Sequence, residues 1–212
     1  MYLGRIVAVG ITPEGKSCAM YRVSSRSFPN RECVINGETV AVIPRAGHES
    51  DLRRNPYIAY NCVRLPRNYA VVSNGSQTDP IAEKIAMGMP LRDAFTLGLL
   101  ALDYEKDSLD TPRIVAAISL NGKESCLGII RKDAVIVRSF DLEPGEVRYL
   151  STYEKNAPAC ANIDTAFAAA NAEEGCDYII GKGVFADFTN AVTAASAYAC
   201  GDHFELAAKI AQ

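Results

Sequence analysis

The chain has 212 residues, of which 49% are hydrophobic and 22% charged, and its formal net charge is −3. These values are close to globular averages and exclude a disordered chain, while the acidic balance argues against a general binder of nucleic acid or membrane surfaces. No apolar run approaches the roughly 18 residues that span a bilayer. Arg5 precedes any signal-peptide core. We therefore expect a soluble, cytoplasmic protein.

Neither the cysteines nor the histidines form a recognisable site. The seven cysteines are scattered without a C-x-x-C pair, and the only histidines, His48 and His203, lie far apart. This pattern is not a disulfide framework or a zinc-binding spacing. We expect free, mostly buried thiols, no metal ion and no cofactor.

The first half of the chain alternates short strands with turns and then changes to helical periodicity. Strands are predicted at residues 3–10, 18–25, 37–44, 57–65 and 68–75, and helices at 78–88 and 89–106.

The second half repeats this order. Strands are predicted at 113–120, 125–132, 134–140 and 147–153, with Asn121-Gly122 as a hairpin turn. Alanine-rich segments at 163–174 and 186–199 are predicted to be helices, before the end of the chain at 204–212. Strands followed by helices, twice, predict an α+β fold: a four-layered αββα sandwich of two mainly antiparallel sheets. No linker interrupts the sequence, so residues 1–212 are predicted to form one domain.

Gly10 to Ser17, GITPEGKS, match the phosphate-binding P-loop pattern, and Asp103 follows an apolar run as a Walker B aspartate would. A P-loop must open a helix, whereas the residues after Ser17 alternate like a strand. Pro13-Glu14-Gly15 is typical of a hairpin turn. We predict a hairpin here and keep a P-loop ATPase as an alternative.

Residues 21–31, YRVSSRSFPNR, contain three arginines and no acid. Alternate residues of a strand share a face, so Arg22, Ser24 and Arg26 are predicted to point the same way. Two guanidiniums around a hydroxyl suit a phosphate group. Pro29 then ends the strand and places Asn30 and Arg31 on a loop, which makes them candidates for the same ligand.

Further polar clusters lie at the ends of predicted elements: residues 55–61, 73–79, 103–107 and 111–113. Each is more often a cap, turn or solvated end than a site. The cluster DYEKD at 103–107 is unusual, because its acids follow a helix C-terminus where negative charge is unfavourable. That local conflict favours a functional role.

Four segments in this order, YRVSSRSFPNR, RNPYIAYNC, VVSNGSQTD and LDYEKDSLDTPRI, resemble the archaeal-type IMP cyclohydrolase family. The resemblance is strongest over residues 1–118 and continues more loosely beyond, including STYEKNAP at 151–158. It implies the last ring closure of de novo purine biosynthesis, in which 5-formamidoimidazole-4-carboxamide ribotide (FAICAR) loses water and becomes IMP. It also implies a fold similar to N-terminal-nucleophile hydrolases. The chain begins Met1-Tyr2, so we expect no amide hydrolysis by an N-terminal nucleophile.

The resemblance implies roles for the polar clusters. Glu105 is the first candidate for the base that takes the carboxamide proton, with Asp103 behind it. Arg31 or Tyr60, and also Tyr104, could donate to the formyl oxygen. Substrate-binding candidates are Arg22, Ser24 and Arg26 for the phosphate, Asn61, Asn74 and Ser76 for the ribose or carboxamide, and Asn30.

The expected partner is therefore the nucleotide, FAICAR or IMP, with no nucleic acid and no membrane; the alanine-rich segments also suggest a homo-oligomer. A non-catalytic module that binds purine nucleotides is the main alternative, since it could use the same arginines.

Overall fold

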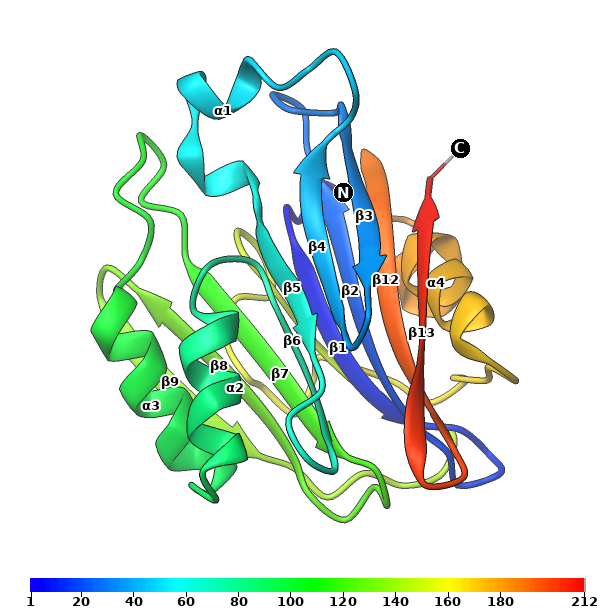
Figure 1. Ribbon diagram of the computed structural model, residues 1–212. Helices are drawn as coiled ribbons and strands as arrows, with labels where there is room; N and C mark the ends of the chain where they lie inside the picture. The colour runs from blue at the N-terminus through cyan, green and yellow to red at the C-terminus, as the bar shows by residue number, and fades with distance from the viewer. Residues whose placement is uncertain (212) are drawn as a thin grey trace.

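Two antiparallel β-sheets packed face to face form the centre of the structure, a computed structural model that describes residues 1–211 (Figure 1). Sheet A has the strand order β11 (Ile163–Asp164), β10 (Val147–Ser151), β1 (Ile6–Ile11), β2 (Ser17–Ser24), β12 (Ala191–Cys200) and β13 (His203–Ile210). Sheet B has the order β3 (Arg31–Asn36), β4 (Thr39–Pro44), β5 (Tyr60–Arg64), β6 (Tyr69–Ser73), β7 (Arg113–Ser119), β8 (Ser125–Arg131) and β9 (Ala134–Ser139).

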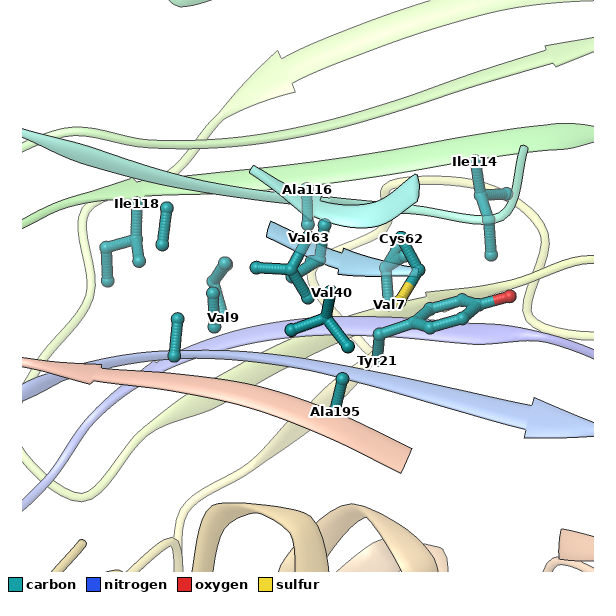
Figure 2. Packing of buried hydrophobic residues seen from close by; sticks show 14 of the residues in the cluster. Val7, Val9, Tyr21, Val40, Cys62, Val63, Ile114, Ala116, Ile118 and Ala195 are labelled. Atoms are coloured by element: carbon teal, nitrogen blue, oxygen red, sulfur yellow. The ribbon is translucent and has the colours of Figure 1, made fainter. Parts of the chain in front are cut away.

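The largest apolar cluster fills the space between the two sheets. Figure 2 shows Val7, Tyr21 and Ala195 of sheet A facing Val63 and other side chains of sheet B. Side chains on alternate positions of these strands enter this core, as the pleat of a strand requires. Within it, the phenol of Tyr21 is a polar group among apolar side chains (Figure 2).

Helices cover the outer face of each sheet. α4 (Ala172–Gly181) packs on sheet A over a second apolar cluster that includes Met20, Cys176 and Phe185. α2 (Thr78–Ala86) and α3 (Leu91–Leu102) pack on sheet B over a third cluster. Two short turns of helix, α1 (Asp51–Arg54) and η1 (Pro56–Ile58), precede β5, and η2 (Gly183–Phe185) follows α4. The predicted α+β sandwich with layers αββα is confirmed.

The P-loop-like segment forms the turn of the β1–β2 hairpin. Ile11 pairs with Ser17, and Gly15 has a φ of 78° and donates its N–H to the carbonyl of Thr12 at 2.8 Å. The chain continues from Ser17 as strand β2 and not as a helix. The predicted hairpin is therefore confirmed, and the P-loop alternative is wrong because a P-loop must open a helix, whereas the residues after this turn form β2.

The alanine-rich second half contains the main errors of the sequence prediction. Residues 186–199 were predicted as a helix, but 191–200 form β12, an interior strand of sheet A. Ala195 and Ala197 face the inter-sheet core, while Ala194 and Tyr198 face α4. With alanine on both faces, the period of two disappears from the sequence, and tertiary packing overrides the helix propensity of alanine.

Three smaller corrections concern other segments. Within 163–174, only the end is helical: α4 begins at Ala172, after Asn171 accepts a hydrogen bond from the N–H of Glu174 at 2.9 Å. Residues 203–210, for which no element was predicted, form β13, and β3 was not predicted either. None of the helices within residues 1–211 has the length and apolarity needed to cross a membrane.

Candidate active site

A cavity of about 360 Å³ lies at the end of the sandwich where β1 begins and β2 ends. Its wall comes from loops that flank the strands, and so from segments far apart in the sequence. The lining residues are Tyr2, Arg5, Ser25, Arg26, Ser27, Phe28, Arg31, Asn55, Tyr57, Ile58, Glu105, Asp107, Leu109 and Tyr153. This size suits a small-molecule ligand.

Glu105 is the most deeply buried acid of the cavity, with 2% of its side chain exposed. Its Oε2 accepts a hydrogen bond from Nη2 of Arg5 at 3.1 Å. Its Oε1 lies 3.9 Å from Nη1 of Arg113 and has no hydrogen-bond partner among residues 1–211. A buried carboxylate oxygen without a partner is rare, and this one belongs to a residue that lines the cavity.

The loop after α3 turns Glu105 inward. The helix ends at Leu102, and Asp103 then takes a φ of 56°, which redirects the chain. The N–H of Glu105 donates to the carbonyl of Thr111 at 2.9 Å, and Asp107 accepts from the N–H of Thr111, also at 2.9 Å. The loop is thus closed by its own hydrogen bonds, which fix the position of Glu105.

Burial raises the pKa of the Glu105 carboxyl above its ordinary value, although Arg5 and Arg113 oppose that effect. Burial is the largest single influence on the pKa of Arg5 and lowers it, but Glu105 and three nearby tyrosines together raise the pKa above its ordinary value and keep the guanidinium charged. Arg113 is held by the carbonyl of Asp103 and by Oε1 of Gln77. A carboxylate with a raised pKa and one free oxygen is suited to accept a proton.

Two buried tyrosines connect the sheets behind the cavity. The hydroxyl of Tyr21, on β2, lies 2.6 Å from that of Tyr60, at the start of β5. Burial raises the pKa of both phenols, while the charges of Arg31 and Arg5 oppose the effect at Tyr60. Both phenols are therefore neutral near neutral pH, and only one of their two protons lies in the bond between them.

Arginine and aromatic side chains form the rim. The rings of Tyr2 and Tyr153 stack with their centroids 5.9 Å apart, and Cζ of Arg26 lies 4.2 Å from the centroid of Tyr2. Arg31 is nearly buried and donates from Nε to the carbonyl of Phe28 at 3.1 Å. Neither arginine forms an ion pair within residues 1–211, so both cations remain available to an anionic ligand.

Three of the predicted site residues line the cavity: Glu105, Arg31 and Arg26. Tyr60 does not line it but lies behind it, within the electrostatic influence of Arg5 and Arg31. These side chains come from the loop after α3, the start of β3, the loop after β2 and β5, and the fold brings them to one end of the sandwich.

The structure does not bring Arg22 and Ser24 to the cavity, which corrects the predicted phosphate cradle. They do share a face of β2, but that face lies under α4 and η2. Arg22 donates to Oγ of Ser24 at 2.9 Å, to the carbonyl of Ile180 at 2.8 Å and to that of Phe188 at 2.6 Å. Burial lowers the pKa of Arg22 to about 10. Because β2 ends at Ser24, Arg26 is not part of the alternation and turns toward the rim instead.

Six other predicted residues also lie outside the cavity lining: Asn30, Asn61, Asn74, Ser76, Asp103 and Tyr104. Most of them are engaged elsewhere. Asn61 donates to both carboxylate oxygens of Asp79, and the fully buried Asn74 donates to the carbonyl of Pro112 at 2.9 Å. Asp103 pairs with Lys106, whose ammonium also lies over the ring of Tyr104.

Sequence reasoning missed Tyr2, Arg5 and Tyr153, which complete the cavity. Arg5 and Tyr2 precede the first strand, where an isolated cation and an isolated aromatic residue carry no local signal. Tyr153 lies in STYEKNAP, so the looser part of the family resemblance could have indicated it. Among residues 1–211, no three His, Cys, Asp or Glu side chains are grouped so that they could hold a metal ion.

The sequence matches the model of a protein family described as "IMP cyclohydrolase-like protein" over residues 2–203. It is 47% identical over 198 residues to an IMP cyclohydrolase of Methanosphaera stadtmanae, covering 93% of this chain and 94% of that protein. It is also 47% identical over 207 residues to an IMP cyclohydrolase of Methanocella arvoryzae, covering 97% and 96%. An IMP cyclohydrolase of Methanococcus aeolicus is 41% identical over 204 residues, covering 95% and 97%.

Proposed function

The chain belongs to the IMP cyclohydrolase-like protein family, and from this premise we propose that it is an IMP cyclohydrolase that closes the ring of FAICAR to give IMP and water. The observation that supports this activity is the sequence identity to proteins named IMP cyclohydrolase, which extends over nearly the whole of both chains. The geometry that fits it is a cavity with a buried carboxylate at its base and arginines at its rim.

The reaction joins two groups of one substrate. The carboxamide nitrogen attacks the formyl carbon, a new C–N bond forms and the formyl oxygen becomes a hydroxyl. This oxygen then leaves as water, and a C=N bond forms to the former formamido nitrogen. The two nitrogens lose one proton each, which balances the water released. The substrate carries its own nucleophile, so the protein must supply proton transfer, charge stabilisation and orientation.

Glu105 is proposed as the base that accepts the carboxamide proton. Glu105 lines the cavity, its Oε1 has no hydrogen-bond partner within residues 1–211, and its raised pKa brings it closer to neutral pH, where general bases work best. Asp103, the reserve candidate, is exposed, and its hydrogen bond with Lys106 lowers its pKa. Those features make it a weaker base and leave it outside the cavity lining.

Arg31 is proposed as the main donor to the formyl oxygen, with Tyr60 as the alternative. Arg31 lines the cavity and its Nε is anchored by Phe28, which leaves the Nη groups to meet developing negative charge. A preorganised donor of this kind contributes roughly 3–4 kcal/mol to the transition state. Tyr60 could donate only if Tyr21 supplies the hydrogen bond between them.

Nucleotide binding is assigned to the rim. Arg26 is a cation without an acidic partner, beside the hydroxyls of Ser25 and Ser27, and this set suits the 5′-phosphate. The ring of Tyr2 is already in contact with Tyr153 and with Arg26, so Tyr153 is the aromatic side chain that we assign to stacking on the imidazole ring. The substrate would thus lie between the rim arginine and the carboxylate at the base.

The proposal is tested by adding purified protein to FAICAR, without ATP, and following IMP formation by ultraviolet absorbance against a protein-free control. Rapid formation that is lost in Glu105→Gln supports a cyclohydrolase with this site. Binding of IMP without cyclisation would instead support the non-catalytic nucleotide-binding module. Cyclisation that persists in Glu105→Gln would keep the activity but remove Glu105 from the role of base.

A further inference from the structure

The edge of sheet A at β13 is unpaired. β13 is the last strand of that sheet, and β3, the terminal strand of sheet B, packs against it at the same end of the sandwich. Figure 1 shows β13 in red at this end, with α4 behind it. An open edge strand offers a row of free backbone donors and acceptors, and proteins usually blunt or cover such edges.

The backbone groups that point outward from β13 follow from its pairing with β12. The N–H of Ala211 donates to the carbonyl of Val192 at 2.9 Å, so these two residues form a hydrogen-bonded pair. Such pairs alternate along an antiparallel ladder. The residues whose N–H and C=O groups point away from β12 are therefore Phe204, Leu206, Ala208 and Ile210.

A groove of about 580 Å³ runs along this edge. Ile35 of β3 forms one wall, the residues that begin α4 form the other, and Glu205 to Lys209 form the floor. Ile35 and Ile210 are each 44% exposed, although both are large and apolar. Glu205 and Lys209 are the charged side chains on the part of β13 that lines the groove, and residues 203–210 contain no proline to block pairing.

We propose that a second copy of this chain occupies the groove, with the two β13 strands paired antiparallel around a two-fold axis at Ala207. In this register Leu206 lies opposite Ala208 of the other copy, and both point their free backbone groups across the interface. Glu205 then lies directly opposite Lys209 of the other copy, twice by symmetry. Shifting the register by two residues in either direction keeps the free backbone groups matched. It also moves Glu205 of one copy away from Lys209 of the other.

The side chains around β13 fit this arrangement. Ala207 faces α4 and Phe204 faces the inter-sheet core, so the two sheets A would join into one continuous sheet with both α4 helices on the same side. Lys209 also pairs with Asp177 of α4 within one copy, so Lys209→Glu places two acids side by side there and Glu205→Lys is the cleaner of the two charge changes. Ile35 and Ile210 would lose water contact as the copies meet, which favours association.

The test uses charge reversal at the two pairs, with mass measured by sedimentation equilibrium over a range of concentrations. We expect the unaltered chain to be a dimer. Glu205→Lys and Lys209→Glu each place like charges opposite one another twice, so we expect each to raise the dimer dissociation constant at least tenfold. When the two variants are mixed, opposite charges meet again, and a heterodimer should form with near-original affinity. Glu143→Lys, the same charge change at an exposed site away from β13, should have no effect.

A backbone variant tests the pairing independently of charge. Ala208→Pro removes an N–H that points outward, so the monomer keeps its β12–β13 hydrogen bonds while the edge loses a donor. We expect a monomer with a near-native circular dichroism spectrum. A monomeric unaltered chain overturns the proposal, as does a dimer that withstands both charge variants or a mixture that fails to associate. The cyclisation assay is separate, so either result leaves the proposed activity independently testable.

Discussion

Nη2 of Arg5 lies 3.1 Å from Oε2 of Glu105, although the two residues are 100 positions apart in the sequence. The pair is buried, and the second carboxylate oxygen has no hydrogen-bond partner within residues 1–211. Removing charges from water is unfavourable, so a buried ion pair with one unpartnered carboxylate oxygen lowers the stability of the fold. Such a pair is typical of a functional site. The pair thus connects the start of β1 with the loop after α3 at the point where chemistry is proposed.

Glu105→Gln tests the proposed base directly. Glutamine keeps the shape and can still accept from Arg5, but it cannot take a proton at neutral pH. We expect the turnover rate to fall by about 10²–10⁴-fold while IMP binds with little change. Steady-state kinetics and IMP titration measure the two effects. Asp103→Asn, the matched change at the exposed neighbouring acid, should leave the rate near that of the unaltered protein; a large loss there would transfer the role to Asp103.

The pH dependence of kcat/KM reports the same group. A base must be ionised, so activity falls as the pH falls through the pKa of Glu105. Because burial raises that pKa, the acid limb should lie above the ordinary value for glutamate. Arg5→Gln removes the cation that opposes this effect, so we expect the limb to move to still higher pH. Lys16→Gln, which removes an exposed cation in the β1–β2 turn, should leave the limb in place; if Arg5→Gln also leaves it in place, Glu105 is not the group that titrates.

Secondary structure was predictable where one face of an element differs from the other. The β1–β2 hairpin shows alternation and turn chemistry together, and α3 carries a clear apolar stripe. β12 does not follow this rule, because alanines occupy both of its faces: one face lies against the inter-sheet core and the other against α4. A strand buried on both sides by small residues has a helix-like composition, and only its neighbours in space reveal its state.

The site was predictable in part for a similar reason. Arg26, Arg31 and Glu105 lie in polar segments whose composition was unusual in itself, so local sequence indicated them. Arg5 had no such signal, since its role depends on a partner 100 residues away. Arg22 shows the opposite error: its charge suggested a ligand, but carbonyl groups at the end of α4 and around η2 satisfy it.

Arg26→Ala tests the phosphate site. A hydrogen bond to a charged group contributes roughly 1.5–3 kcal/mol. Arg26 is exposed and water screens it, so we expect the lower end, a rise in KM for FAICAR of about tenfold with little change in kcat. Thermal unfolding should be nearly unaltered, because Arg26 is exposed and its guanidinium lies over the ring of Tyr2 at the rim. An unchanged KM would mean that the phosphate binds elsewhere.

Arg22→Met is the complementary change at the arginine that the sequence grouped with Arg26. Arg22 is fully buried, and the change removes the donor for the carbonyls of Ile180 and Phe188, which are partly buried. Each buried carbonyl left without a partner costs about 1–3 kcal/mol, so the loss of two partners should lower the free energy of unfolding by at least about 2 kcal/mol. Chemical denaturation measures this loss. The fraction that folds should keep its KM, and a raised KM with unchanged stability would return Arg22 to the ligand site.

Arg31→Lys separates charge from geometry at the proposed oxyanion donor. Lysine keeps the positive charge but loses both the bond from Nε to the carbonyl of Phe28 and the fork of Nη donors. If the donor must be preorganised, kcat should fall by about 10²-fold or more while KM changes little. Arg53→Lys, the same substitution at an exposed position of α1, provides the control for the chemistry of the change. A near-normal rate in Arg31→Lys would mean that charge alone suffices there. Tyr60→Phe would then be expected to show the loss, because the phenol bonded to Tyr21 is the alternative donor proposed above.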